Sequence, residues 1–148
     1  MPNQGPPKPP PPAGGISIKA IEGIGPAYAA KIRKAGVRTT AALLQKGSTP
    51  EDRKSLAKVT GVTPKQILEW VNRADLFRVQ GVGAQYSDLL EAAGVDTVVE
   101  LSKRKPEALI EALAKANEKK NLVNQLPGLS RVQTWVKHAK SLKRVVKY

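Results

Sequence analysis

Two stretches of the chain repeat one another, and this duplication limits the possible folds more than any other feature of the sequence. At an offset of 58 residues, Gly23-Ile24-Gly25 matches Gly81-Val82-Gly83, and Ala35-Gly36-Val37 matches Ala93-Gly94-Val95. Further along, a Trp-Val pair recurs at an offset of 65. Self-similarity of this kind indicates a supersecondary unit that has been duplicated in tandem. The sequence therefore predicts two related units, residues 16–76 and 77–148.

Both units are predicted to be helical. Each carries an apolar stripe at i, i+3, i+4 and i+7, which is the spacing of one helix face. The Thr-Pro pairs at Thr49 and Thr63 predict helix starts, with threonine as the N-cap and proline in the first helical position. Ser130, followed by Gln133, is predicted to cap the last helix in the same way. No segment alternates apolar and polar residues as a strand does, so the fold class is expected to be all-α. The two stripes are Ile67, Trp70, Val71 and Ala74, and Val132, Trp135, Val136 and Ala139.

The N-terminal residues have a different composition from the rest of the chain. Residues 1–12 read MPNQGPPKPPPP and are followed by Ala13-Gly14-Gly15. Such a composition cannot bury enough apolar surface to fold and favours extended polyproline II conformations. We expect residues 1–15 to form a disordered Pro/Gly-rich tail. Either it is a spacer, or it is a ligand for an adaptor domain with an aromatic groove.

Composition excludes several classes of protein. The chain has no cysteine, which rules out a disulfide scaffold and a thiolate metal site and points to a reducing compartment such as the cytoplasm. No apolar run approaches the roughly 18 residues of a membrane span, so no membrane partner is expected. The single histidine, His138, has no acid within a helical turn to orient it as a base. We therefore expect a protein that is not an enzyme and that has no small-molecule substrate, cofactor or metal site.

The net charge of +13 on 148 residues favours a polyanionic partner. Nucleic acid is the commonest such partner of basic proteins. Charge alone does not distinguish DNA from RNA, and a membrane surface would attract the same excess of lysine and arginine.

The segment from Ile21 to Val37 carries the most specific motif. Gly23 and Gly25 allow a tight turn whose backbone is not covered by side chains. Pro26 fits the first helical position, which leaves the amides of Ala27 and Tyr28 free at a helix N-terminus. Such amides, together with the partial positive charge of the helix end, form a site for phosphate. Gly36 is predicted to end this helix in a left-handed cap.

These residues resemble the helix-hairpin-helix motif, whose Gly-apolar-Gly turn holds the DNA backbone in repair polymerases, ligases and Holliday-junction proteins. Over Ile18–Leu142 the chain is also similar to an uncharacterised bacterial family of tandem helix-hairpin-helix proteins. The fragments Trp70-Val71-Asn72-Arg73 and Tyr86-Ser87-Asp88-Leu89 are among those that carry this similarity. The resemblance implies two helical hairpins and a DNA-binding role. It also allows a monovalent cation held by the carbonyls of the turn, as in some members of the motif class.

The two hairpins differ in charge. Hairpin one, residues 16–46, has six lysine or arginine residues and one acid, whereas hairpin two, residues 77–102, has one arginine and four acids. We therefore assign phosphate contact to hairpin one, and a structural or protein-binding role to hairpin two. A basic C-terminal stretch is expected to extend the groove that follows the duplex. The residues expected to contact nucleic acid are Gly23, Ile24, Gly25, Ala27, Tyr28, Lys31, Arg33, Lys34, Arg38, Lys137, Lys140, Lys143 and Arg144. Those expected to contact protein are Gly81, Gly83, Tyr86, Asp88 and Glu91.

The sequence is compatible with two functions. The first is a non-catalytic module that binds DNA backbone phosphates with little sequence specificity. The second is an assembly scaffold in which basic hairpin one meets acidic hairpin two of another copy or of a different protein, without nucleic acid.

Overall fold

A computed structural model describes residues 17–21 and 23–148 of the chain. The predicted tail, residues 1–15, lies outside the described residues, as do Ile16 and Glu22. Every regular element in the described part is a helix, so the predicted all-α fold class is confirmed. The one pairing of β type there is an isolated bridge between Ser17 and Thr39. The elements are η1 (Ile18–Ala20), α1 (Pro26–Lys34), α2 (Thr40–Lys46), α3 (Pro50–Thr60), α4 (Pro64–Leu76), α5 (Ala84–Ala92), α6 (Val98–Ser102), α7 (Pro106–Lys120) and α8 (Leu129–Ser141).

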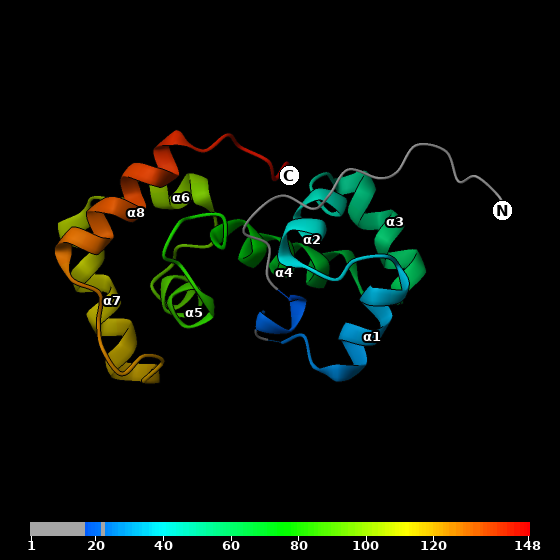
Figure 1. Cartoon of the computed structure of the whole chain (residues 1–148), viewed down its shortest axis with the longest axis horizontal. Coiled ribbons are helices and arrows are strands. Elements are labelled where there is room, and N and C mark those ends of the chain that lie inside the picture. The colour runs from blue at the N-terminus through cyan, green and yellow to red at the C-terminus, as the bar shows by residue number, and fades with distance from the viewer. Residues whose placement is uncertain (1–16, 22) are drawn as a thin grey trace, which may run out of the picture.

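The helices form two halves that lie side by side (Figure 1). The first half, residues 17–76, contains η1 and α1 to α4, and the second half, residues 77–141, contains α5 to α8. Each half has its own cluster of buried apolar side chains. Trp70 is 2% exposed in the first cluster and Trp135 is 1% exposed in the second. The predicted apolar stripes are therefore confirmed as the core faces of α4 and α8.

Threonine side chains cap four of the helices. Thr49 accepts a hydrogen bond from the amide of Asp52 and Thr63 from that of Gln66, which confirms both predicted starts. Thr39 and Thr97, which match at the 58-residue offset, cap α2 and α6 in the same way.

The predicted cap at Ser130 is wrong. Helix α8 begins at Leu129, and its N-cap is Gly128, which has no side chain to accept a hydrogen bond. The carbonyl of Gly128 already accepts the first intrahelical bond, from the amide of Val132 at 3.1 Å. Ser130 thus lies inside the first helical turn, where its hydroxyl cannot serve as the cap.

The short helix expected ahead of the first glycine pair is a 3₁₀ helix and not an α-helix. Only η1, a single 3₁₀ turn, precedes it. Ile18 donates its amide to the carbonyl of Arg38 at 3.2 Å, and Ile21 is already extended, with φ −80° and ψ 124°. A segment fixed at both ends over so few residues has room for one turn of helix and no more.

Helices α1 and α5 end in the same hydrogen-bonded motif. Gly36 has φ +88° and Gly94 has φ +92°, so the left-handed cap predicted at Gly36 is confirmed. The amides after these glycines reach back to the helix: Val37 donates to Ile32 at 3.2 Å, and Val95 donates to Leu90 at 2.8 Å. This is the Schellman pattern, in which the following apolar residue folds back onto the helix. Both valines are fully buried.

Polar contacts of Asp75 join the end of α4 to the second half. Its carboxylate is buried and accepts hydrogen bonds from the Arg78 guanidinium at 2.6 and 2.8 Å. The other carboxylate oxygen accepts a hydrogen bond from the backbone amide of Val98, the first residue of α6, at 2.9 Å.

No helix within 17–21 and 23–148 has the length and apolar composition needed to cross a bilayer.

Replacing Gly36 with alanine is expected to lower the free energy of unfolding by about 1 kcal/mol, because a Cβ atom is strained in the left-handed region. Urea unfolding followed by circular dichroism measures the change. Lys34→Ala, an exposed change on the same helix, is the control and is expected to stay within about 0.5 kcal/mol of the wild type. Equal stability of the two variants would contradict the assignment of the cap.

Candidate nucleic-acid interface

The first glycine turn, Gly23–Tyr28, leads directly into α1. Gly23 has φ +93°, and Gly25 is the N-cap of α1 without a side-chain hydrogen bond. Pro26 occupies the first helical position, as predicted. The first intrahelical bond runs from the amide of Ala29 to the carbonyl of Gly25, at 2.9 Å. The amides of Ala27 and Tyr28 precede that bond and therefore point out of the helix N-terminus.

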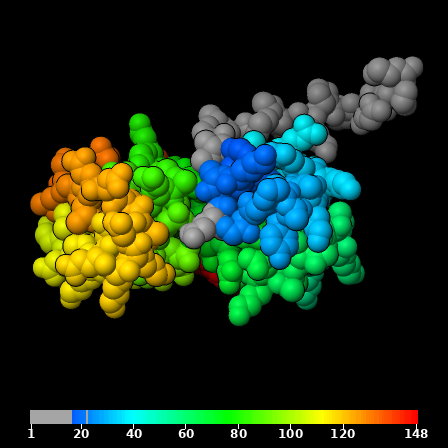
Figure 2. Space-filling model, turned by 90° about the horizontal axis from the view of Figure 1, so that it is seen from below, coloured from blue at the N-terminus to red at the C-terminus, as the bar shows by residue number. Residues whose placement is uncertain are grey.

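This turn lies on the surface of the first half. Gly23, Gly25, Ala27 and Tyr28 are exposed, whereas Ile24 is buried. A Cβ atom added to Gly25 would meet no atom within 4 Å. Ile24 therefore anchors the turn in the core, and the backbone on either side of it is open to an approaching ligand. Figure 2 views this face, with the segment that includes α1 in blue on the surface.

The buried side of the turn rests on Trp70 of α4. A Cβ atom at Gly23 would lie 3.5 Å from the indole Nε1. The Tyr28 ring packs edge-on against the indole, with the ring centroids 5.2 Å apart. The indole N–H is itself buried and has no hydrogen-bond partner in the described part of the chain. Packing against Trp70 on its buried side thus fixes the position of the turn.

Four cations follow the turn. Lys31, Arg33, Lys34 and Arg38 are all exposed, and none of them forms an ion pair with another described residue. The Lys31 ammonium lies 5.9 Å from the centre of the ring of Tyr28, the last residue of the turn. Lys31 therefore lies beside the ring of Tyr28, a residue of the turn, and the other three cations follow further along the chain.

The second glycine turn, Gly81–Tyr86, has the same backbone. Gly81 has φ +88°, and Gly83 is the N-cap of α5 without a side-chain hydrogen bond. The Tyr86 ring packs against Trp135 with the centroids 5.1 Å apart, as Tyr28 packs against Trp70. Gly81 and Gly83 are exposed. The two turns differ less in shape than in the side chains around them.

Residues from other helices compensate part of the negative charge of hairpin two. Asp88 and Glu91 both form ion pairs with Arg73 of α4. At the same turn, Arg131 of α8 donates a hydrogen bond to the Tyr86 hydroxyl at 2.9 Å. Counting charges within residues 77–102 missed both contacts because their partners come from α4 and α8, outside that range. No local signal in the sequence links Arg73 to α5.

The predicted basic residues of the C-terminal stretch do not join the first glycine turn. Lys137 and Lys140 are exposed on α8, at the opposite end of the molecule from α1 (Figure 1). Lys143 and Arg144 follow α8. The carbonyl of Lys143 accepts a hydrogen bond from Arg78 at 2.9 Å, and the Arg144 Nε donates to the carbonyl of Val146 at 3.2 Å. The structure brings together Gly23, Gly25, Ala27, Tyr28 and Lys31, but not these four residues.

A cleft of about 510 Å³ runs beside Gly23, between the two halves. Its lining includes Trp70, Arg73 and Glu91, and also Lys120 from the last turn of α7. Sequence reasoning did not single out Lys120, because nothing in its neighbourhood predicts that α7 reaches the first half. Within the described residues, no group of three or more histidine or acidic side chains is arranged to hold a metal ion.

A scan of protein families matches residues 22–142 to a domain of unknown function, DUF4332. The match covers most of the chain, and the protein belongs to this family. No curated protein and no solved structure matches the sequence. The family is described as a domain of unknown function, so membership assigns no activity to the chain. The geometry of the two turns is therefore the basis for the proposed function.

Replacing Arg73 with glutamine is expected to lower the free energy of unfolding by about 1–2 kcal/mol, because two carboxylates between the halves lose their counter-charge. Urea unfolding gives the value. Arg104→Gln removes the exposed pair with Glu100 and is expected to cost less than about 0.5 kcal/mol. Equal losses in the two variants would show that the Arg73 pairs contribute no more than a surface pair.

Proposed function

We propose that the protein is a non-catalytic DNA-binding module that contacts backbone phosphates through hairpin one, in the manner of a helix-hairpin-helix motif. The observation that carries this proposal is the exposed first glycine turn, which leads into a helix N-terminus and is followed by exposed cations that have no ion-pair partner among the described residues. Backbone amides at a helix N-terminus favour an anion through both hydrogen bonding and the helix dipole.

The same chemistry implies little sequence specificity. Main-chain amides and lysine side chains position a protein on the phosphate backbone without reading base edges. We propose DNA rather than RNA because the resemblance of the Gly-Ile-Gly turn is to DNA-binding hairpins. A location in the bacterial cytoplasm or nucleoid fits this role.

The contacts of hairpin two make the scaffold function the weaker candidate. That function requires negative charge on hairpin two that is available to a basic partner. Asp88 and Glu91 already face Arg73 within the same chain. Of the remaining acids of hairpin two, Glu100 of α6 pairs with Arg104, and Asp96 lies in the α5–α6 connection. We therefore infer that hairpin two has a structural role.

The contacts of His138 are in keeping with a non-catalytic role. Its Nδ1 accepts the backbone amide of Gln80 at 2.9 Å, so this ring nitrogen helps to fix the segment before the second glycine turn. A nitrogen that accepts a main-chain hydrogen bond is not free to take a proton from a substrate. We infer that His138 is a structural residue.

The double variant Gly25→Glu with Lys31→Glu is expected to reduce DNA affinity at low salt by about tenfold or more, since it places carboxylates beside the free amides. The glutamate at position 25 has open space, so the fold should be kept. Fluorescence anisotropy with a labelled duplex measures affinity, and circular dichroism checks helicity.

The matched control for this experiment is Gly83→Glu with Lys105→Glu, which changes the net charge by the same amount. Gly83 also has open space for a side chain, and Lys105 is exposed. This control is expected to bind within about threefold of the wild type, because only general electrostatic attraction is reduced. If both double variants lose affinity equally, hairpin one is not the phosphate site.

Affinity for duplex DNA is expected to fall with salt, with a slope of log K against log salt of about −4, as for the neutralisation of about four phosphates. Titrations between low and moderate salt give the slope. Wild-type protein that shows no DNA binding at low salt, but that forms large assemblies dissolving at high salt in light scattering, would favour the scaffold instead.

A further inference from the structure

The C-terminal segment, residues 142–148, leaves the second half and returns to the first (Figure 1). Helix α8 ends at Ser141, and Leu142 is extended, with φ −87° and ψ 139°. The chain then runs back toward α2, α3 and α4. Arg78 holds the beginning of this path through the carbonyl of Lys143 at 2.9 Å.

Val146 carries the main apolar contact of the segment. It is 3% exposed and belongs to the apolar cluster of the first half, although it follows a helix of the second. The neighbouring Val145 packs against the same cluster. In the described part of the chain, all the other members of that cluster's buried set lie within residues 18–74.

Arg53 of α3 fastens the segment to the first half. Its side chain is 4% exposed when Lys147 is in place. Nη1 donates to the carbonyl of Gly47 at 2.8 Å, and Nη2 donates to the carbonyl of Lys147 at 2.7 Å. The amide of Lys147 donates in turn to the carbonyl of Ser48 at 2.7 Å. One guanidinium thus joins the α2–α3 connection to the C-terminal segment.

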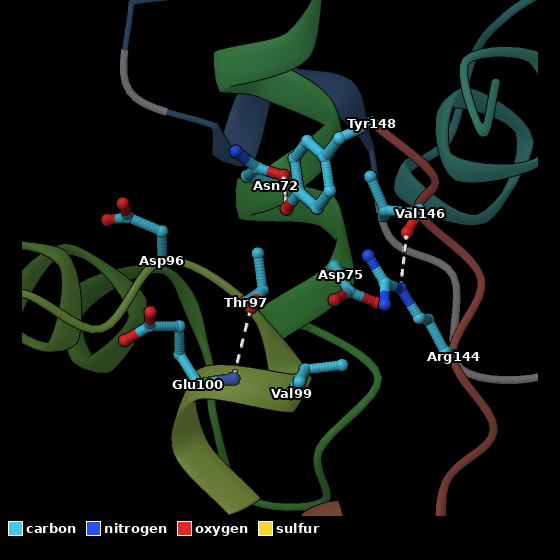
Figure 3. Close-up of a pocket in the computed structure, with 9 residues that line it drawn as sticks. All are labelled: Asn72, Asp75, Asp96, Thr97, Val99, Glu100, Arg144, Val146 and Tyr148. Carbon is cyan, nitrogen blue, oxygen red and sulfur yellow. Dashed lines mark hydrogen bonds between the residues drawn. The ribbon is translucent and has the colours of Figure 1, made fainter. Parts of the chain in front are cut away.

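Tyr148 forms the last contact, shown in Figure 3. Its hydroxyl donates to the Oδ1 of Asn72 on α4 at 3.0 Å. Burial, followed by the negative charge of Asp75, raises the pKa of the Tyr148 phenol above 10.0. The phenol therefore keeps its proton, and can donate this hydrogen bond, across the neutral range.

Besides Val145 and Val146, apolar side chains connect the halves at the end of α4. Leu76 at the end of α4 lies in the apolar cluster of the second half, and the adjacent Phe77 packs against the cluster of the first half. The polar contacts from α4 to α5 and α6 are the ion pairs of Arg73 and the hydrogen bond from Val98 to Asp75. A pocket of about 270 Å³ lies beside the segment, and its lining residues are Asn72, Asp75, Asp96, Thr97, Val99, Glu100, Arg144, Val146 and Tyr148. The packing there is incomplete, and the segment borders the gap.

We propose that the C-terminal segment is a detachable latch that fixes the orientation of the two halves. When it is docked, Val146 and Arg53 hold the second half against the first. When it is released, the halves remain joined at the end of α4, by the apolar contacts of Leu76 and Phe77 and by the polar contacts of Arg73 and Asp75. The latch thereby sets the distance between the two glycine turns. This role does not depend on nucleic-acid binding.

The full chain has no cysteine, so two introduced cysteines can be spin-labelled without background. Lys54→Cys on α3 and Glu111→Cys on α7 are exposed positions in different halves. In this labelled chain, Val146→Asp and Arg53→Gln are each expected to broaden the interspin distance distribution. Val59→Asp is the matched control, because Val59 is 69% exposed, and it is expected to leave the distribution narrow.

Hydrogen exchange at the Lys147 amide provides a second measurement. Both latch variants are expected to raise its exchange rate by about tenfold or more, as local opening does, while amides in α4 and α8 stay protected. A narrow distribution in folded Val146→Asp and Arg53→Gln would overturn the proposal. Loss of helicity in both variants would also overturn it, since the segment would then be an integral part of the first core.

Discussion

The packing of a glycine turn on a buried tryptophan is the contact on which each half depends. A Cβ atom at Gly23 would come within 3.5 Å of the Trp70 indole nitrogen, and one at Gly81 within 3.2 Å of the Trp135 nitrogen. Both glycines also have positive φ, so the backbone bends where the indole leaves least room. The last helix of each half thus supports its first turn. This contact fixes the direction in which the amides of α1 and α5 point, and the proposed function follows from that direction.

Charge and backbone shape contribute separately to the difference between the two turns. The backbones match, but Lys31 beside the first turn corresponds to the fully buried Leu89 in the second half. Asp88 and Glu91 serve to bind α5 to Arg73, so the negative charge of hairpin two acts inside the molecule. Only the first turn therefore has a cation beside its tyrosine at this position. In the second half, Asp88 and Glu91, at the positions of Ala30 and Arg33, bind α5 to α4.

Local patterns in the sequence predicted the parts of the fold that depend on local physics. The Thr-Pro pairs, the left-handed cap at Gly36 and the stripe around Trp70 each depend on residues within one or two helical turns. The failures have non-local or competing causes. Gly128 is the N-cap of α8 in place of the predicted Ser130, and the short helix before the first glycine pair is a 3₁₀ turn whose Ile18 amide donates to the carbonyl of Arg38. Of the candidate site, the residues of the first turn lie together as predicted. The partners of Arg73 and the path after Ser141 depend on contacts between distant segments, which no local pattern encodes.

The placement of the two tryptophans gives the molecule an optical property. The chain contains two of them, one beneath each glycine turn and each in contact with that turn's tyrosine. Indole emission responds to nearby charge and to changes in aromatic contacts, so each half has its own intrinsic fluorophore. Two proteins that each retain a single indole would let a spectroscopist observe the first and second halves independently, without any attached dye.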